Sequence, residues 1–123
     1  MKIFTTYFAK LKKIDPEILP IAICVKVPDW FNGPVLSELA PTKSILYQFK
    51  KTGDKKLYIE RFNDEVLSMV PPESIYNLIV SIAETNNVDQ VALVCYEKSD
   101  SFCHRHLVAD WLNQALDLTI EEL

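Results

Sequence analysis

The sequence predicts an α/β fold in which a mostly parallel sheet is flanked by helices, in a Rossmann-like three-layer arrangement. Three short runs, at residues 2–8, 20–27 and 88–96, are rich in β-branched and aromatic residues and predict strands. The long segment between the second and third runs repeats its apolar residues at helical spacing. A chain of 123 residues is long enough to bury one core. We therefore expect residues 1–123 to form a single α/β domain.

The predicted strands differ in their surroundings. Residues 2–8 carry the polar group Thr5-Thr6-Tyr7 near their end. Residues 20–27 are apolar on both faces for most of their length, which is typical of a buried central strand. In the tail, residues 118–120 predict a short edge strand.

Proline, glycine and small polar residues mark the helix boundaries. A helix is predicted over residues 41–53, because the segment begins with proline and ends with glycine. Apolar residues recur at helical spacing over 54–70 and again over 72–85. A final helix follows the third strand, and we expect Asp100 or Ser101 to cap it.

The composition excludes several classes of protein. A net charge of −4 argues against a nucleic-acid partner, which usually requires a basic surface. No stretch approaches 18 apolar residues, so we expect no membrane partner. Three cysteines without the dense spacing of a disulfide-rich secreted fold indicate a reducing, cytoplasmic setting. The sequence leaves the oligomeric state open.

Reactive side chains are concentrated between Cys95 and His106. This segment holds two thiols, a carboxylate, two imidazoles and a guanidinium, including both histidines of the chain. It joins the third strand to the last helix. Because ligands of parallel sheets bind outside the carboxyl ends of the strands, we expect the segment to meet Thr5 and Tyr7 from the first strand and Lys26 from the second.

One hypothesis for this cluster is the binding of an anion or a nucleotide. Cys103, His104 and Arg105 fall in the predicted first helical turn, where free N–H groups and the positive end of the dipole favour negative ligands. The guanidinium suits a phosphate or a carboxylate, and Glu97 can accept hydrogen bonds from a ribose. The chain has only two glycines and no glycine-rich phosphate loop, which excludes a P-loop or a dinucleotide fingerprint.

A second hypothesis is catalysis. Cys103 and Cys95 are candidate nucleophiles, because a thiol beside cations at a helix N-terminus has a depressed pKa. Glu97 could instead act as nucleophile or general base in cleavage of an N-glycosidic bond, with Arg105 holding the leaving group. We expect Cys95 and Glu97 to line one wall of the pocket, and Cys103, His104 and Arg105 the other, so that Glu97 faces Arg105. The structural alternative pairs these two residues directly and leaves the cysteines as packing residues.

Metal binding is a third hypothesis. Cys95, Cys103, His104 and His106 include the ligand types that zinc prefers. On a helix, however, adjacent Cys103 and His104 would point about 100° apart, and no Cys-x-x-Cys pair is present. A disulfide between Cys95 and Cys103 is conceivable at a strand-to-helix corner but is disfavoured in the cytosol. We therefore expect no metal site, no cofactor and no disulfide.

The motif formed by Cys95-Tyr96-Glu97 and Cys103-His104-Arg105 resembles the Domain of Unknown Function 488 family, in which a strand ending in Cys-x-Glu is followed by Cys-His-Arg. Thr5-Thr6-Tyr7 is similar to a Thr-Ser-Tyr start in that family, with Thr6 replacing serine. Leu39-Ala40-Pro41 and Tyr58 are also similar. The resemblance covers nearly the whole chain. It implies an α/β fold and supplies no established reaction.

We expect the site to bind an anionic, nucleotide-derived or otherwise phosphorylated small molecule; the sequence leaves open whether the protein hydrolyses this ligand and is an enzyme. The predicted site residues are as follows: catalytic Glu97, Cys103 and Cys95, and ligand-binding Arg105, His104, Thr5, Tyr7 and Lys26. The alternative is a small protein-interaction or inhibitor module without catalysis, which would use Trp30, Phe31 and the acidic tail 121–122.

Overall fold

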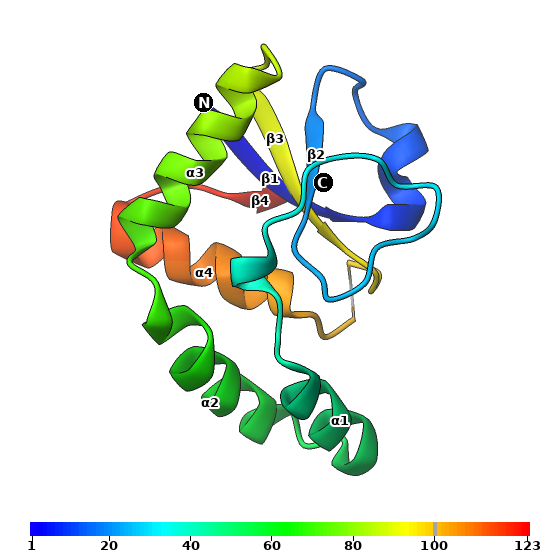
Figure 1. Cartoon of the computed structure of the whole chain (residues 1–123), viewed down its shortest axis with the longest axis vertical. Coiled ribbons are helices and arrows are strands. Elements are labelled where there is room, and N and C mark those ends of the chain that lie inside the picture. The colour runs from blue at the N-terminus through cyan, green and yellow to red at the C-terminus, as the bar shows by residue number, and fades with distance from the viewer. Residues whose placement is uncertain (100) are drawn as a thin grey trace.

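The computed structural model describes residues 1–99 and 101–123. Four parallel strands form one sheet in the order β2-β3-β1-β4, with helices on its faces (Figure 1). The predicted α/β class is therefore confirmed. The strands are β1 (Lys2–Tyr7), β2 (Leu19–Ala22), β3 (Gln90–Cys95) and β4 (Glu121–Glu122).

Strand β3 lies between β2 and β1 and is buried on both faces. Its register with β1 runs from Lys2 opposite Gln90 to Tyr7 opposite Cys95. On its other side Ala22 lies opposite Val94. Residues 91–95 are all buried, as the continuous apolar run predicts for an inner parallel strand.

The described residues also form four α-helices and three 3₁₀-helices. They are η1 (Phe8–Lys13), η2 (Ser37–Leu39), α1 (Lys43–Thr52), α2 (Lys55–Glu65), η3 (Leu67–Met69), α3 (Pro72–Thr85) and α4 (His104–Leu116). Thr42 caps α1 by accepting the Ile45 N–H at 3.1 Å, and Asp54 caps α2 by accepting the Leu57 N–H at 3.1 Å. Gly53, at φ +67°, makes the tight turn between these two helices.

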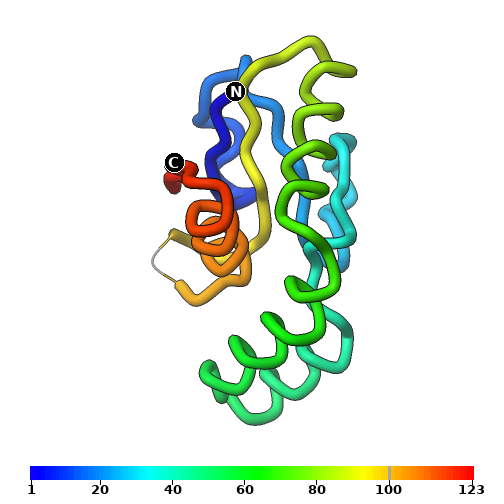
Figure 2. Tube along the Cα trace, turned by 90° about the vertical axis from the view of Figure 1, so that its left-hand side faces the viewer, coloured from blue at the N-terminus to red at the C-terminus, as the bar shows by residue number. Residues whose placement is uncertain are grey.

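The direction of each crossover connection determines which face of the sheet each helix covers. The chain travels one way along the sheet from β1 to β2 and the opposite way from β2 to β3 and from β3 to β4. Because parallel crossovers are right-handed, η1 lies on one face, whereas α3 and α4 share the other (Figures 1 and 2). The α1–α2 pair extends beyond the carboxyl ends of the strands (Figure 1).

Several element boundaries differ from the predicted ones. Strand β2 ends at Ala22 rather than at residue 27, because its backbone turns to pair with the returning loop: the Leu36 N–H donates to the Ala22 carbonyl at 2.8 Å. The tail strand lies at 121–122, one step beyond the predicted 118–120, because Ile120 is buried in the core. Helix α2 ends at Glu65.

The start of α4 also differs. Its N-cap is Cys103, and no side chain caps it. Ser101 therefore does not have the predicted capping role, and Asp100 lies outside the described residues.

Among the described residues, no single helix has both the length and the hydropathy to cross a membrane. The segments Lys55–Met69 and Pro72–Thr85, bent by 73°, reach that length and composition only as a pair.

Candidate functional site

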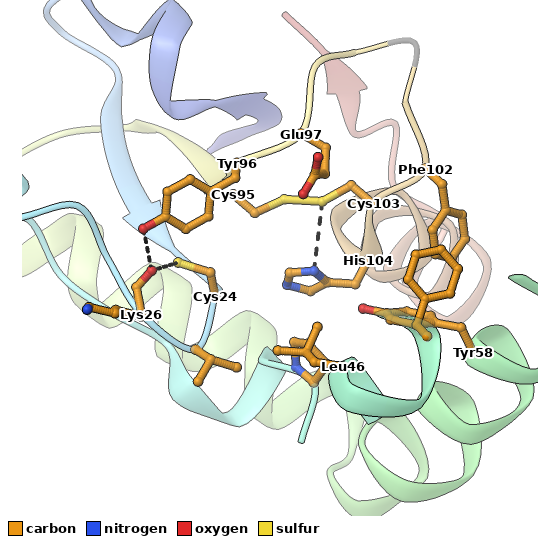
Figure 3. A pocket seen from close by; sticks show the side chains of 13 residues that line it. Cys24, Lys26, Leu46, Tyr58, Cys95, Tyr96, Glu97, Phe102, Cys103 and His104 are labelled. Atoms are coloured by element: carbon orange, nitrogen blue, oxygen red, sulfur yellow. Dashed lines mark hydrogen bonds between the residues drawn. A yellow bond between two sulfur atoms is a disulfide. The ribbon is translucent and has the colours of Figure 1, made fainter. Parts of the chain in front are cut away.

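A cavity of about 350 Å³ lies at the carboxyl ends of β2 and β3, above the α1–α2 pair (Figure 3). Side chains from both strand ends, from α1 and α2, and from the start of α4 line it. Most of the lining is apolar. The polar groups at its wall include Glu97, Lys26 and His104.

Three aromatic rings make one wall of the cavity. Phe49 of α1, Tyr58 of α2 and Phe102, just before α4, have ring centroids 4.9–5.3 Å apart. The rings of Phe49 and Tyr58 both contact Phe102, which brings the wall together from α1, α2 and the segment before α4. The helical spacing of Phe49 and Tyr58 is typical of core packing, and in the structure both rings also line the cavity.

The opposite wall is the loop that follows β2. The Lys26 carbonyl accepts the Tyr96 hydroxyl at 2.6 Å and the Cys24 thiol at 3.3 Å (Figure 3). The Tyr96 bond fixes the loop against the residue that follows β3, and the Cys24 bond is local to the loop. The Lys26 side chain is exposed, so its ammonium group is available at the rim.

A disulfide between Cys95 and Cys103 closes the top of the cavity (Figure 3). The expectation that no disulfide forms is wrong for this structure. Cys95 ends β3, and Cys103 has an extended backbone at φ −154°, ψ 145°, which turns its side chain back toward the strand. In this state neither sulfur carries a free thiol.

His104 lies beneath the disulfide and is buried. Its Nε2 hydrogen-bonds the Ile23 carbonyl, and its Nδ1 lies 3.8 Å from the Cys103 sulfur. Burial lowers the pKa of His104 to about 4, with the Arg105 and His106 charges adding to the fall against the opposing Ile23 hydrogen bond. The ring is therefore neutral at pH 7. Since Nε2 must be the protonated nitrogen to donate to a carbonyl, Nδ1 carries the free lone pair.

Glu97 is exposed at the rim, with its carboxylate beside the disulfide in Figure 3. Burial raises the pKa of Tyr58 above its ordinary value, and the Glu97 charge raises it further. Glu97 and the Tyr58 hydroxyl thus face the same space. A ligand hydroxyl in that space can donate to the carboxylate.

Arg105 points away from this cavity. It is fully buried, and its Nε and NH2 donate to the two carboxylate oxygens of Glu122 at 3.0 and 2.9 Å. Its NH1 donates to the Cys95 sulfur at 3.2 Å, and its guanidinium carbon lies 5.9 Å from the Tyr7 ring centroid. The predicted arrangement of Glu97 opposite Arg105 is therefore wrong.

Thr5 belongs to the same closed cluster. Its hydroxyl donates to Glu122 at 2.6 Å, and Ser99 donates to Glu122 at 2.7 Å. Burial alone would raise the pKa of Glu122, but the hydrogen bonds from Arg105, Thr5 and Ser99 outweigh it and bring the pKa to about 2. In the sequence Glu122 belongs to an acidic tail, and no local signal indicates this role.

The structure thus divides the predicted site residues into two groups. Cys95, Cys103, His104, Glu97 and Lys26 line the cavity. The other predicted residues, Arg105, Thr5 and Tyr7, gather around Glu122.

Two comparisons with known proteins found no match: none among curated proteins and none among solved structures. A family model described as the active DUF488-N3 subclade, DUF488-N3a, matches residues 17–116. That range contains the whole cavity lining and both halves of the Cys-x-Glu and Cys-His-Arg motif.

Proposed function

This chain belongs to the Domain of Unknown Function 488 family, and we propose that it binds a nucleotide-derived small molecule in the cavity beneath the Cys95–Cys103 disulfide. The description of the matched subclade contains the word active and names no reaction. The proposal therefore depends on the chemistry of the cavity itself.

The observation that carries the proposal is the combination of an aromatic wall with a carboxylate at the rim. The volume of about 350 Å³ falls in the range of small-molecule sites, roughly 300–1,000 Å³. Phe49, Tyr58 and Phe102 offer a flat ring a surface to stack on, as aromatic side chains do for nucleobases. Glu97 stands where a ribose hydroxyl can donate to it.

The position of Arg105 refines the expected ligand. Because Glu122 engages the guanidinium, Arg105 is not available to a phosphate at this cavity, whereas Lys26 offers an ammonium group at the exposed rim. An exposed ammonium contributes little to affinity, since water and salt screen it. We therefore expect the base and the ribose to supply most of the binding free energy, with the phosphate adding a smaller part.

If the ligand is turned over, Glu97 is the residue to do it. The other predicted catalytic residues, Cys95 and Cys103, are joined to each other and cannot attack a substrate in this state. Glu97 can deprotonate a water that attacks the anomeric carbon of an N-glycoside while the base leaves with a proton from solvent. Hydrolysis would then be lost in Glu97→Gln.

The test is a thermal-shift series with adenosine, AMP, ADP-ribose and inorganic phosphate. We expect the three nucleoside-containing compounds to raise Tm and phosphate alone to leave it unchanged. Phe102→Ala should reduce the shifts, whereas the control Tyr47→Ala, on an exposed ring of α1 outside the cavity, should retain them in full. The proposal fails if phosphate alone gives the same shift as AMP, or if none of the four compounds gives a shift.

One observation favours the second candidate function, a protein-interaction module. Trp30 is 60% exposed and, with Phe8 and Tyr96, lines a separate hollow on the η1 face. Of the other residues of that hypothesis, Phe31 is buried and Glu122 pairs with Arg105, whereas Glu121 is exposed. Trp30→Ala should abolish capture of such a partner while Glu97→Gln leaves it intact.

A further inference from the structure

We propose that Cys95, Cys103 and His104, once the disulfide is reduced, form a binding site for a thiophilic metal ion of the zinc class that opens onto the cavity. The proposal goes beyond small-molecule binding and does not depend on it. It differs from the sequence expectation that no metal binds.

The three ligand atoms are already gathered. The Cys95 and Cys103 sulfurs and the His104 Nδ1 lie within 4.8 Å of one another, and all three residues are buried. Zinc bonds thiolate sulfur at about 2.3 Å and imidazole nitrogen at about 2.0–2.1 Å. Once the disulfide is reduced and its two sulfurs move apart, one ion can therefore reach all three atoms.

Cys103 and His104 are adjacent in sequence but do not occupy successive helical positions. Cys103 has extended backbone angles and precedes α4, whereas His104 is the first helical residue. The divergence of about 100° between helical neighbours, which disfavoured a metal site on sequence grounds, does not apply to this pair. The turn into α4 instead brings both side chains to the end of β3.

The surrounding hydrogen bonds suit a metal site. The Ile23 carbonyl engages His104 Nε2, which leaves the Nδ1 lone pair directed toward the sulfurs. Metal-binding histidines are typically oriented by such a bond on the second nitrogen. Arg105 NH1 donates to the Cys95 sulfur at 3.2 Å and supplies a positive charge against two thiolates.

Three protein ligands leave one position of a tetrahedral ion open. Here that position faces the cavity, because all three residues line it. Sites with three protein ligands and one exchangeable ligand are typical of catalytic rather than structural zinc. Two sulfurs and one imidazole select zinc or copper(I) and disfavour magnesium or calcium.

Reduction of the disulfide and binding of the metal ion are two separate steps, and each balances in electrons and protons. A dithiol gives two electrons and two protons to the Cys95–Cys103 disulfide and is itself oxidised to a disulfide. The ion then replaces one proton on each thiol, so that two protons are released for each ion bound. The Cα atoms of the two cysteines lie 7.6 Å apart, a separation greater than most disulfides span.

The test is titration of the reduced full-length protein with cobalt(II), under a phosphine reductant and without oxygen. We expect one equivalent to bind, with a thiolate-to-cobalt charge-transfer band, intense d–d bands of a tetrahedral ion, and release of two protons. Cys95→Ser and Cys103→Ser should each weaken binding by about 100-fold or more. Cys24→Ser is the matched control, since Cys24 lies outside the three-ligand group, and it should bind as the unmodified protein does.

Cadmium-113 NMR of the unmodified protein provides a measurement that does not depend on any variant folding. We expect a resonance in the range of two-sulfur, one-nitrogen coordination. The proposal is overturned if reduced protein binds cobalt without a charge-transfer band, if Cys95→Ser retains the band unchanged, or if the cadmium resonance indicates oxygen ligands alone. The cysteines would then form a redox pair only.

Discussion

His104 and Arg105 are consecutive residues of α4, yet their side chains enter two different environments. His104 turns toward an open cavity, where its Nε2 hydrogen-bonds the Ile23 carbonyl and its Nδ1 lies 3.8 Å from the Cys103 sulfur. Arg105 turns into a closed cluster, where two of its nitrogens donate to the Glu122 carboxylate and a third donates to Cys95. Cys95 lies between the two regions and contacts both.

The open cavity is the region that we propose binds a ligand, whereas the closed cluster around Glu122 supports the fold. In many open α/β sheets the ligand lies where the chain diverges to opposite faces, which here is between β1 and β3. The Arg105–Glu122 pair fills that position, with Glu122 supplied by β4 at the edge of the sheet. The cavity opens one strand further along, between the ends of β2 and β3. The following predictions test this division.

The largest effect is expected from Glu122→Gln. It leaves the fully buried Arg105 guanidinium without its counter-charge, so we expect the free energy of unfolding to fall by about 3–5 kcal/mol, as for other broken buried pairs. Urea denaturation measures it. Glu65→Gln is the matched control, because the Arg61–Glu65 pair is exposed on α2, and its unfolding midpoint should stay close to that of the unmodified protein. Equal losses in the two variants would show that the closed cluster has no special role.

The two regions should also lose stability in different pH ranges. The pKa of His104 falls from its ordinary 6.5 to about 4 on folding, so the unfolded chain binds the extra proton and stability declines as pH drops from 6.5 to 4. At about 1.4 kcal/mol for each pKa unit, the loss is about 3 kcal/mol. NMR titration of the His104 ring, together with Tm measured across this range, checks it. A ring that titrates near pH 6.5 would contradict the buried, neutral His104.

Glu122 acts in the lower range. Its pKa is about 2 in the folded protein and near 4.5 ordinarily, so its contribution is complete above pH 4.5 and disappears as pH falls toward 2. Acid unfolding of the unmodified protein should therefore steepen below pH 4.5. In Glu122→Gln this lower part of the profile should flatten, while the decline between pH 6.5 and 4 persists.

A smaller effect, confined to the open region, is expected from Phe102→Ala. Loss of one stacking surface should weaken binding of ADP-ribose by about tenfold or more, in line with about 1–3 kcal/mol for base–aromatic stacking. Isothermal titration calorimetry measures it, with Tyr47→Ala as the control. Unchanged affinity in Phe102→Ala would place the ligand elsewhere.

The smallest effect is expected from Trp30→Ala. Trp30 is 60% exposed and packs edge-on against Phe8, with the two ring centroids 5.9 Å apart. The free energy of unfolding should therefore fall by only about 0.5–1 kcal/mol. Affinity for ADP-ribose should not change, because Trp30 does not line the cavity. A large loss of affinity would connect the η1 face to the site.

The sequence predicted the parts of this molecule that depend on local pattern. The apolar runs identify the inner strands, and the segment from Cys95 to His106 marks the end of β3 and the start of α4. It could not predict Arg105 pairing with Glu122, 17 positions away, because β4 is only two residues long and its register with β1 depends on the folded sheet. His104 and Arg105 are adjacent positions of α4, and this single helical step directs the His104 side chain to the cavity and the Arg105 side chain to Glu122.

The aromatic wall was missed for another reason. Phe49 and Tyr58 recur at helical spacing, a pattern that buried core residues and cavity walls share. Only the extension of α1 and α2 beyond the sheet leaves one edge of these rings uncovered. The position of Phe102 beside them depends on the loop before α4, for which the sequence has no periodic signal.

Chemical-shift mapping of ADP-ribose on the ¹⁵N-labelled protein tests the central claim most directly, because it reports on both regions at once. We expect the largest amide shifts at Phe49, Tyr58, Glu97 and Phe102, and none at Thr5, Tyr7 or Glu122. The opposite pattern, with shifts concentrated around Glu122, would show that Arg105 binds the ligand and that the cavity beneath the disulfide does not.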